Sequence, residues 1–194
     1  MLGVVLCGGQ STRMTSDKGL LTLNEDTWAQ ISANKLKTLG VQVAISVNRS
    51  QVDAYSLIFP REQLVADNDE LQIKGPLCGI LSVHVQHPEQ DLFVLACDMP
   101  MMQTDLLTAL LVQYQKNILA DSFIYSNDGE LEPLCGIYRS KGLARIMHLY
   151  LSEQFPKHSM KYMLEQIKVH FTPVPGNRQE CFRNFNTRTE LNGL

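Results

Sequence analysis

A short segment near the start of the chain combines glycines, hydroxyls and cations at a spacing suited to binding phosphate. It runs from Leu6 to Lys18 and reads LCGGQSTRMTSDK. Because Gly8 and Gly9 carry no Cβ, the backbone amides of this loop can approach an anion closely. The side chains of Arg13 and Lys18 can then neutralise phosphate charge. The segment contains neither GxxxxGK[ST] nor GxGxxG, so it is not one of the two common phosphate-binding loops. Composition alone leaves a second interpretation open, a solvated turn with two surface cations.

A carboxylate follows a second apolar segment. Asp98 comes directly after the run Asp91–Cys97 (DLFVLAC), which is typical of a strand buried on both faces. In an open α/β sheet, ligands bind at the carboxyl ends of the strands. A carboxylate at that place can hold Mg²⁺ that is bridged to nucleotide phosphates. A turn-forming aspartate before Pro100 would give the same local sequence, so this alternative also stays open.

Two further segments are candidates for binding. In Gly75–Gly79 (GPLCG), Pro76 suits the first turn of a helix, and the two glycines permit close approach of a ligand or of another helix. Near the C-terminus, Asn184 and Asn186 point to one side of an extended segment and Phe185 to the other. Asparagine side chains there can orient a sugar, a phosphate or a metal-bound water, or they can cap the last helix.

The elements that must position these residues follow from apolar periodicity. Strands are predicted at Leu2–Leu6, Val41–Val47, Gln63–Ala66 and Asp91–Cys97, and helices around Trp28–Leu39, at Leu77–His87 and at Thr104–Gln115. Strands that alternate with helices of this length predict right-handed βαβ units and a mostly parallel sheet.

The second half of the chain has a different pattern. The turn sequence Asn127-Asp128-Gly129 predicts a hairpin between strands at Ala120–Ser126 and Leu134–Tyr138. Helices are predicted at Ser140–Ser152 and Ser159–Gln166. The last strand, Val169–Val174, is expected at a sheet edge because Pro173 cannot donate a hydrogen bond to a neighbour.

Length and charge limit the possible functions. A chain of 194 residues predicts one domain. The 17 Lys and Arg against 20 Asp and Glu give a net charge of −3, which argues against a broad nucleic-acid-binding surface. No uncharged apolar run approaches the roughly 20 residues of a membrane span, so no membrane association is expected.

The cysteines and histidines predict neither a disulfide framework nor a metal centre. The 5 cysteines are scattered and include no CxxC, which favours free thiols and a cytoplasmic protein. His84 and His87 are three apart on a predicted helix, and a solvated helix end is the preferred interpretation over a metal-ligand pair.

Taken together, the motifs resemble those of the MobA family, the molybdenum cofactor guanylyltransferases, within the wider nucleotide-diphospho-sugar-transferase-like group. The family patterns are LAGGxSxRMGxDK, GPLAG, CDxP, PLxxxY and NxNTPExL. They correspond here, in the same order, to Leu6–Lys18, Gly75–Gly79, Cys97–Pro100, Pro133–Tyr138 and Asn184–Leu191. This chain departs from the patterns at Cys7, Thr15 and Arg188-Thr189, and none of these changes removes a charged group that the chemistry needs.

The resemblance implies a single-domain, three-layer α/β sandwich with a mostly parallel sheet and a Rossmann-like nucleotidyltransferase fold over residues 1–194. The N-terminal half is expected to bind the nucleotide and the C-terminal half the acceptor. The implied reaction transfers GMP from GTP to the terminal phosphate of a molybdopterin-type molybdenum cofactor and releases pyrophosphate. Apo-molybdoenzymes or their chaperones are further expected partners.

The resemblance also implies roles for particular residues. The expected catalytic residues are Arg13, Lys18 and Asp98, and Asp98 is the expected ligand of Mg²⁺. The expected nucleotide-binding residues are Leu6, Cys7, Gly8, Gly9, Lys18, Asn48, Asp67, Gly75 and Asp98. Asp67 can accept hydrogen bonds from guanine N1–H and its exocyclic amine, and Asn184 and Asn186 are the expected acceptor-binding residues.

Two other functions remain open from the sequence. One is a related Mg²⁺-dependent nucleotidyltransferase that uses CTP or a phosphosugar or polyol phosphate acceptor. Cytidylyl relatives often show LAAG, so Gly8-Gly9 favours the guanylyl pattern. The other is a nucleotide-binding regulatory subunit without turnover. The presence of Arg13, Lys18 and Asp98 together favours catalysis, because sensing a nucleotide needs no metal carboxylate.

Overall fold

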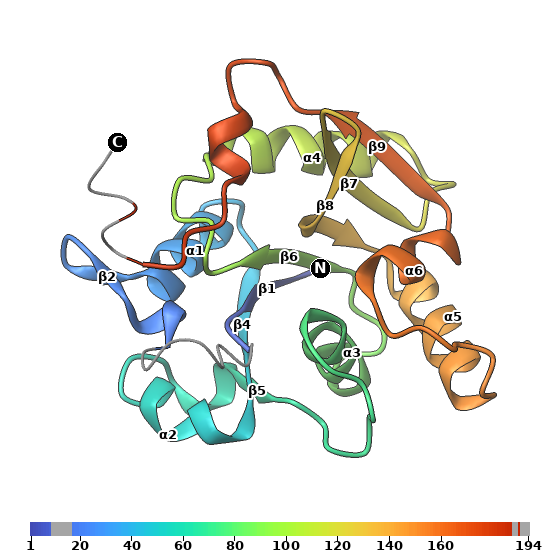
Figure 1. Ribbon diagram of the computed structural model, residues 1–194, viewed down its shortest axis with the longest axis horizontal. Coiled ribbons are helices and arrows are strands. Elements are labelled where there is room, and N and C mark those ends of the chain that lie inside the picture. Colours follow the sequence, from blue (N-terminus) through green and yellow to red (C-terminus); the bar gives the residue numbers. More distant parts are fainter. Residues whose placement is uncertain (9–16, 188–189, 191–194) are drawn as a thin grey trace.

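A seven-stranded sheet forms the centre of the computed structural model, which describes residues 1–8, 17–187 and 190 (Figure 1). The strand order is β5-β4-β1-β6-β8-β7-β9. The strands are β1 (Leu2–Leu6), β4 (Gln42–Val47), β5 (Leu64–Ala66), β6 (Leu92–Ala96), β7 (Ser122–Asn127), β8 (Glu130–Tyr138) and β9 (Val169–Pro173). A separate small hairpin pairs β2 (Thr22–Leu23) with β3 (Asp26–Thr27).

The first four strands of this order are parallel, as the sequence predicts. β1 lies between β4 and β6, with Val4 opposite Ala44 on one side and Val94 on the other. All residues of β1 and β6 are buried, because strands covered on both faces need apolar side chains on both. The predicted strands are therefore confirmed, and their carboxyl ends lie at one edge of the sheet.

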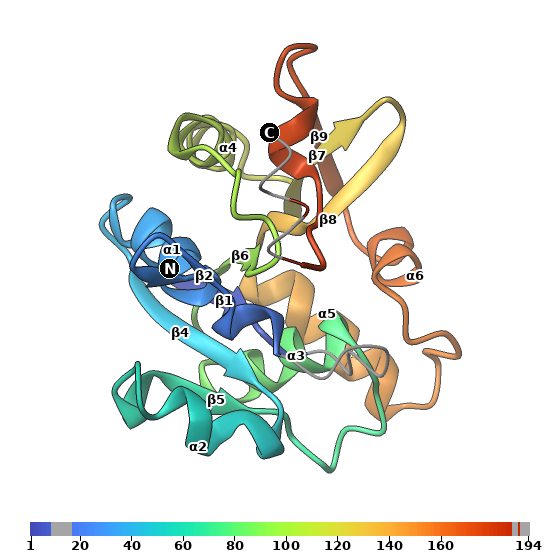
Figure 2. The same ribbon diagram turned by 60° about the vertical axis from the view of Figure 1, so that its left-hand side comes forward.

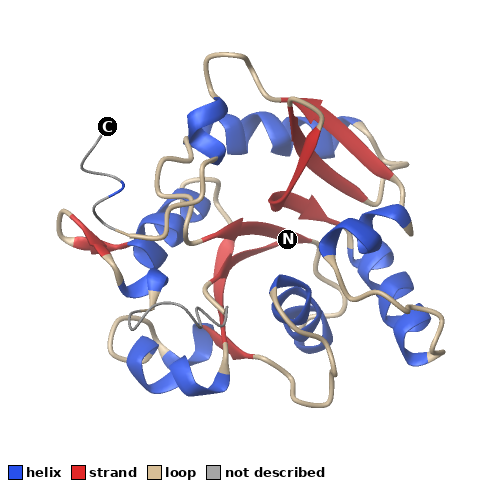
Figure 3. Ribbon diagram, in the orientation of Figure 1, coloured by secondary structure: helices blue, strands red, loops and turns tan. Residues whose placement is uncertain are grey.

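Helices cover both faces of the sheet and make three layers (Figure 3). One face packs against α1 (Trp28–Lys37) and α4 (Thr104–Lys116). The other face packs against α3 (Pro76–Gln86), α5 (Ser140–Leu151) and α6 (Met160–Glu165). The short helix α2 (Val52–Tyr55) and the 3-10 helices η1 (Lys18–Leu20), η2 (Arg49–Gln51), η3 (Arg61–Gln63) and η4 (Gln179–Phe182) lie in the connections.

The second half adds antiparallel pairing to the sheet. β7 and β8 form the predicted hairpin, whose turn residues Asp128 and Gly129 have φ of 49° and 88°, as a two-residue turn of this kind requires. β8 begins at Glu130 rather than at Leu134 and pairs antiparallel with β6. β9 lies at the edge of the sheet beside β7 (Figure 2), as its prolines predict.

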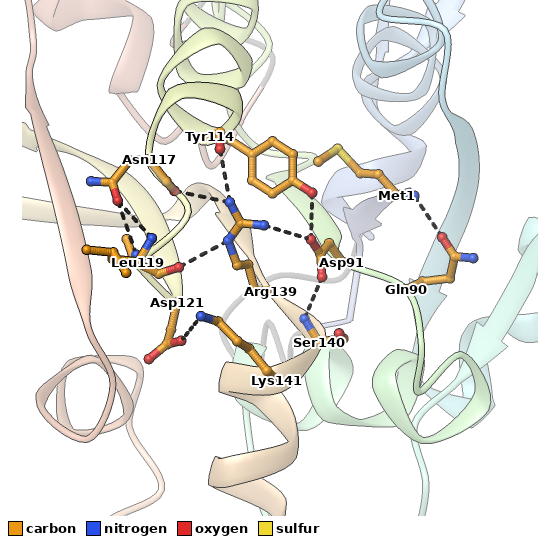
Figure 4. A network of polar contacts seen from close by, with 11 residues as sticks. Met1, Gln90, Asp91, Tyr114, Asn117, Leu119, Asp121, Arg139, Ser140 and Lys141 are labelled. Carbon is orange, nitrogen blue, oxygen red and sulfur yellow. Dashed lines mark hydrogen bonds and ion pairs between the residues drawn. The ribbon is translucent and has the colours of Figure 1, made fainter.

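The amino edge of the sheet is fixed by a polar network around Asp91 and Arg139 (Figure 4). Asp91 accepts hydrogen bonds from the Tyr114 hydroxyl at 2.6 Å and from the Ser140 backbone N–H at 2.7 Å. The Arg139 guanidinium lies 3.6 Å from Asp91 and stacks 4.2 Å from the Tyr114 ring centroid. It also donates to the carbonyls of Tyr114, Asn117 and Ala120. This network joins β6, α4 and α5 at the end of the sheet opposite Asp98.

Several single-residue expectations are settled by burial. All 5 cysteines are free and buried, which confirms the prediction of free thiols. The expectation of a solvated position is wrong for His84, whose exposed fraction is 4%. Helix α3 packs between the sheet and α5, and His84 lies on its covered side although the neighbouring Val85 is 44% exposed. Burial lowers the pKa of His84. Among the helices that the structure describes, none has both the length and the apolar character needed to cross a membrane.

Candidate active site

The carboxyl ends of four neighbouring strands bring the predicted site residues to one edge of the sheet. Gly8 follows β1, Asn48 follows β4, Asp67 follows β5 and Asp98 follows β6. The chain proceeds outward from β1 to β4 and β5, and then crosses to the other side of β1 to form β6. This reversal makes the gap between β1 and β6 a topological switch point, which is the usual ligand site of open α/β sheets.

Gly8 lies against both Asn48 and Asp67. A Cβ on Gly8 would lie 3.5 Å from the backbone nitrogen of Asn48 and 3.6 Å from Oδ2 of Asp67. The Asn48 side chain caps η2, since its Oδ1 accepts the Gln51 N–H at 3.1 Å and the Ser50 hydroxyl at 2.6 Å. Three predicted nucleotide-binding residues therefore form one contiguous surface.

Asp67 carries a buried acceptor that no described residue satisfies. Its Oδ1 is buried and has no hydrogen-bond partner among the described residues, although buried polar atoms in proteins usually have one. Burial, followed by the charge of Asp69, raises the pKa of Asp67 to about 6. Asp69 itself is paired with Arg49, with 2.7 Å between Oδ2 and Nε. A carboxylate oxygen left free in this way is suited to accept an N–H from a ligand.

On the other side of the switch point, Lys18 pairs with Asp98. Nζ of Lys18 lies 3.3 Å from Oδ2 of Asp98, and their side chains are 26% and 21% exposed. Lys18 opens η1, whose N-terminus is capped by the Asp17 carboxylate. The structure thus joins two predicted catalytic residues at the place where β1 and β6 end.

Asp98 also fits the role of a magnesium ligand. Its Oδ1 is buried and has no hydrogen-bond partner in the described part of the chain. The residues that the structure describes contain no group of three or more His, Cys, Asp or Glu able to hold a metal ion. A single carboxylate such as that of Asp98 suits Mg²⁺, which is commonly held by one or two carboxylates together with substrate phosphates and water.

The C-terminal segment reaches the same place. The Phe185 N–H donates to the backbone oxygen of Asp98 at 2.9 Å, and the buried Phe185 ring packs against Trp28. Asn184 and Asn186, on either side of Phe185, are exposed. The structure therefore places both predicted acceptor-binding residues next to the loop that carries Asp98.

The remaining predicted residues have different roles or are not described. Gly9 and Arg13, like Thr15 and Arg188-Thr189, lie outside the residues that the structure describes. The side chains of Leu6 and Cys7 are buried. The Cys7 N–H donates to the Ser46 carbonyl, and the carbonyls of Leu6 and Cys7 accept from Cys97 N–H and Gln51 Nε2, so a ligand could only share these backbone groups. Gly75 adopts φ of +76° at the N-terminus of α3 with open space around it, whereas a Cβ on Gly79 would lie 2.5 Å from Oγ of Ser46. The glycine at 79 is thus explained by helix packing.

Two residues of this region are missed by the sequence motifs. Gln51 and Tyr55 contact Asp17, the residue before Lys18. The available signal was the spacing Asn48-x-x-Gln51 after a strand, which forms a capping box in the structure.

Comparison with known proteins identifies the family. Residues 3–168 match the family model described as MobA-like NTP transferase domain. The chain belongs to this family. A probable molybdenum cofactor guanylyltransferase from Geobacillus is 30% identical, with 100% of this chain and 97% of the relative covered. A molybdenum cofactor guanylyltransferase from Shewanella frigidimarina is 32% identical, with 95% of this chain and 90% of the relative covered.

A solved structure shows the same fold. The molybdopterin-guanine dinucleotide biosynthesis protein A of Archaeoglobus fulgidus has a TM-score of 0.77 at 22% identity, with 100% of this chain and 96% of that chain covered. The predicted family and the predicted fold class are therefore confirmed. The names of these relatives agree with the expectation of a nucleotidyltransferase.

Proposed function

We propose that this protein is a molybdenum cofactor guanylyltransferase. It transfers GMP from GTP to the terminal phosphate of a molybdopterin-type molybdenum cofactor and releases pyrophosphate. The observation that carries this proposal is the placement of Asp67 and of the Lys18–Asp98 pair on one edge of the sheet. Three strand spacings separate β5 from β6, or about 14 Å, so the two ends of one nucleotide can be held at once.

In this proposal Asp67 recognises the guanine base by hydrogen bonds, and the backbone around Gly8 contacts the rest of the nucleotide. The unpaired Oδ1 of Asp67 lies in a buried position that suits hydrogen bonds from guanine N1–H and its exocyclic amine. Gly8 leaves the space between Asn48 and Asp67 open. Backbone groups of Leu6, Cys7, Gly9 and Gly75 complete the nucleotide contacts.

The phosphates lie toward Lys18 and Asp98. A phosphate acceptor is already ionised at neutral pH, so the reaction needs positioning and charge neutralisation rather than a strong base. An oxygen of the acceptor phosphate forms a bond to the α-phosphorus of GTP, and the bond to the leaving pyrophosphate breaks. Lys18 and Arg13 offset the charge of the triphosphate and of pyrophosphate. Mg²⁺ held by Asp98, when bound, supplies further positive charge at the transferred phosphate.

The two halves of the chain bind different substrates. The N-terminal half provides the nucleotide site, and the C-terminal half provides Asn184 and Asn186 for the acceptor. We further infer that the protein is cytoplasmic, because all five thiols are free, and that apo-molybdoenzymes or their chaperones receive the product.

The test combines binding with turnover. Melting temperatures are measured with GTP, ATP, CTP and UTP, with and without Mg²⁺, and pyrophosphate release is measured with molybdopterin-type cofactor as acceptor. GTP with Mg²⁺ is expected to raise the melting temperature selectively, since ligand at 100 times its Kd stabilises by about 2.7 kcal/mol. Asp67→Ala should remove the preference for GTP over CTP.

Equal stabilisation of the wild type by CTP and GTP would contradict the guanine assignment. Selective GTP binding without pyrophosphate release would instead favour a regulatory nucleotide-binding subunit.

A further inference from the structure

Asp17 immediately precedes Lys18, and its carboxylate is fully engaged. Its Oδ1 accepts the Gly19 N–H at 3.0 Å and the Tyr55 hydroxyl at 2.9 Å, and its Oδ2 accepts from Nε2 of Gln51 at 2.6 Å. Three donors occupy both oxygens, and no described cation is paired with Asp17. The acid is therefore suited to fix its own segment of chain rather than to contact phosphate or metal.

Tyr55 is a rigid anchor for this carboxylate. Its exposed fraction is 0%, and its ring is stacked on Phe59 with 13° between the ring planes. The hydroxyl lies so close to Gly19 that a Cβ at position 19 would collide with it. The turn after Lys18 thus packs directly against the Tyr55 hydroxyl, and only glycine fits at position 19.

Gln51 ties the same carboxylate to the nucleotide loop. Its Nε2 donates to the backbone oxygen of Cys7 at 3.1 Å as well as to Asp17, and its Oε1 accepts the Asn48 N–H at 2.8 Å. One side chain therefore connects the end of β1, the end of β4 and the start of η1. These are the three segments whose relative placement sets where Lys18 lies against the phosphates.

We infer that Gln51 and Tyr55 are positioning residues, which act through Asp17 to hold the Lys18 ammonium at the switch point next to Asp98. The lysine side chain has four rotatable bonds and loses much conformational freedom when its ammonium is held in one place. The Asp17 cap and the packed Gly19 fix its backbone on both sides, so that only side-chain freedom is left to be lost when substrate binds. This inference rests on the proposed role of Lys18 as a phosphate contact.

The test is a double-mutant cycle between Tyr55→Phe and Lys18→Ala. Tyr55→Phe keeps the buried ring and removes only the hydroxyl. It should lower kcat for pyrophosphate release about tenfold and raise the KM for GTP by no more than about threefold, because the base contacts at Asp67 are untouched. In the Lys18→Ala background the same change should cause less than about twofold further loss, since the two residues act as one unit. Equal losses in both backgrounds, or a wild-type kcat for Tyr55→Phe, would overturn the inference.

A matched control separates positioning from stability. Tyr125 is equally buried and donates its hydroxyl to the Leu106 carbonyl at 2.8 Å. Tyr125→Phe removes a hydrogen bond of the same kind far from Lys18, and kcat should stay within about twofold of the wild type. If Tyr125→Phe lowers kcat as much as Tyr55→Phe does, the effect is a general loss of packing and the inference is wrong.

Gln51→Met tests the bridge to the nucleotide loop. Methionine has a similar length and no donor, so kcat should fall as in Tyr55→Phe. The KM for GTP should also rise, because the contacts with Asn48 and Cys7 are lost. An unchanged kcat would remove Gln51 from the inference.

Binding of inorganic tripolyphosphate keeps this inference separate from the proposed function. Lys18→Ala should weaken tripolyphosphate binding at least about tenfold and Tyr55→Phe about threefold, with no further loss in the double variant. If the wild type releases no pyrophosphate from GTP, the proposed function fails while this cycle can still be measured. Additive losses of tripolyphosphate affinity would overturn the positioning role.

Discussion

The backbone N–H of Phe185 donates to the backbone oxygen of Asp98 at 2.9 Å, which joins the last part of the chain to the loop after β6. The bond involves only main-chain atoms of Asp98, so its carboxylate stays available to Lys18 and to a metal ion. Because Phe185 is also buried against Trp28, the exposed Asn184 and Asn186 are held beside the site by a hydrogen bond and by packing. The hydrogen bond between Phe185 and Asp98 therefore holds the proposed acceptor and metal sites next to each other.

Asp98→Asn should abolish most activity and preserve the fold. The substitution keeps the shape of the side chain and the main-chain bond to Phe185, but it removes the charge that would hold Mg²⁺. Loss of this charge stabilisation should lower the rate of pyrophosphate release at least about 100-fold, while the melting temperature changes little.

Asp105→Asn provides the matched control for Asp98→Asn, because Asp105 is an exposed partner of Arg178 outside the site. Its activity should equal that of the wild type. Near-normal turnover of folded Asp98→Asn would remove Asp98 from the mechanism, and loss of the fold would make Asp98 a structural residue.

Binding of GTP should weaken below pH 6 because of Asp67. Burial raises the pKa of this carboxyl from 3.8 to about 6, and only the ionised form accepts both guanine donors. GTP affinity measured by calorimetry should fall by up to about tenfold per pH unit below 6. In Asp67→Asn this dependence should disappear, while the titration of the GTP phosphates remains the same in both proteins.

The same pKa shift also makes the stability of the folded protein depend on pH. The folded pKa of Asp67 lies above its unfolded value, so the folded state binds more protons between pH 3.8 and about 6. Protonation of Asp67 therefore favours the folded state at low pH, and this stabilisation is lost as the pH rises through that window. Asp67→Asn should therefore raise the melting temperature more at pH 7.5 than at pH 4. An equal shift at both values would mean that Asp67 is not buried as the structure has it.

Arg139→Ala should destabilise the protein strongly without affecting the site. The side chains of Arg139 and Asp91 are 17% and 18% exposed. Removal of the guanidinium leaves Asp91 with its two hydrogen bonds but no cation, and it takes a donor from three backbone carbonyls. The free energy of unfolding, measured with urea, should fall by about 3 kcal/mol. Lys141 offers a control, because its side chain is 55% exposed where it pairs with Asp121. Lys141→Ala should lower the free energy of unfolding by less than about 1 kcal/mol. Similar losses from both variants would contradict this ranking.

The thiols should be reduced and protected. Unreduced protein in denaturant should give a count of five with a thiol reagent, and the native protein should react slowly because all five cysteines are buried. A count well below five in denaturant would show a disulfide that the structure does not contain.

The sequence by itself determined the local elements and the residue types of the site. Strands such as Leu2–Leu6 and Asp91–Cys97 could be predicted because their apolar runs and the glycines and prolines around them act over a few residues. The same patterns place Asp98 directly after one buried strand and Lys18 at the end of the glycine-containing loop that follows another. They also placed β9 at a sheet edge, because a proline cannot donate to a neighbouring strand.

Only the tertiary structure decided which of these residues meet. Lys18 and Asp98 are 80 residues apart, and their contact depends on β1 pairing with β6, which no local pattern specifies. The contact of Gly8 with Asp67 likewise depends on the order β5-β4-β1. The burial of His84 is likewise a tertiary effect, since α3 packs against the sheet and against α5, which follows much later in the chain. Periodicity reports the face of an element that is covered, but the partner that covers it is chosen by packing of the whole sheet.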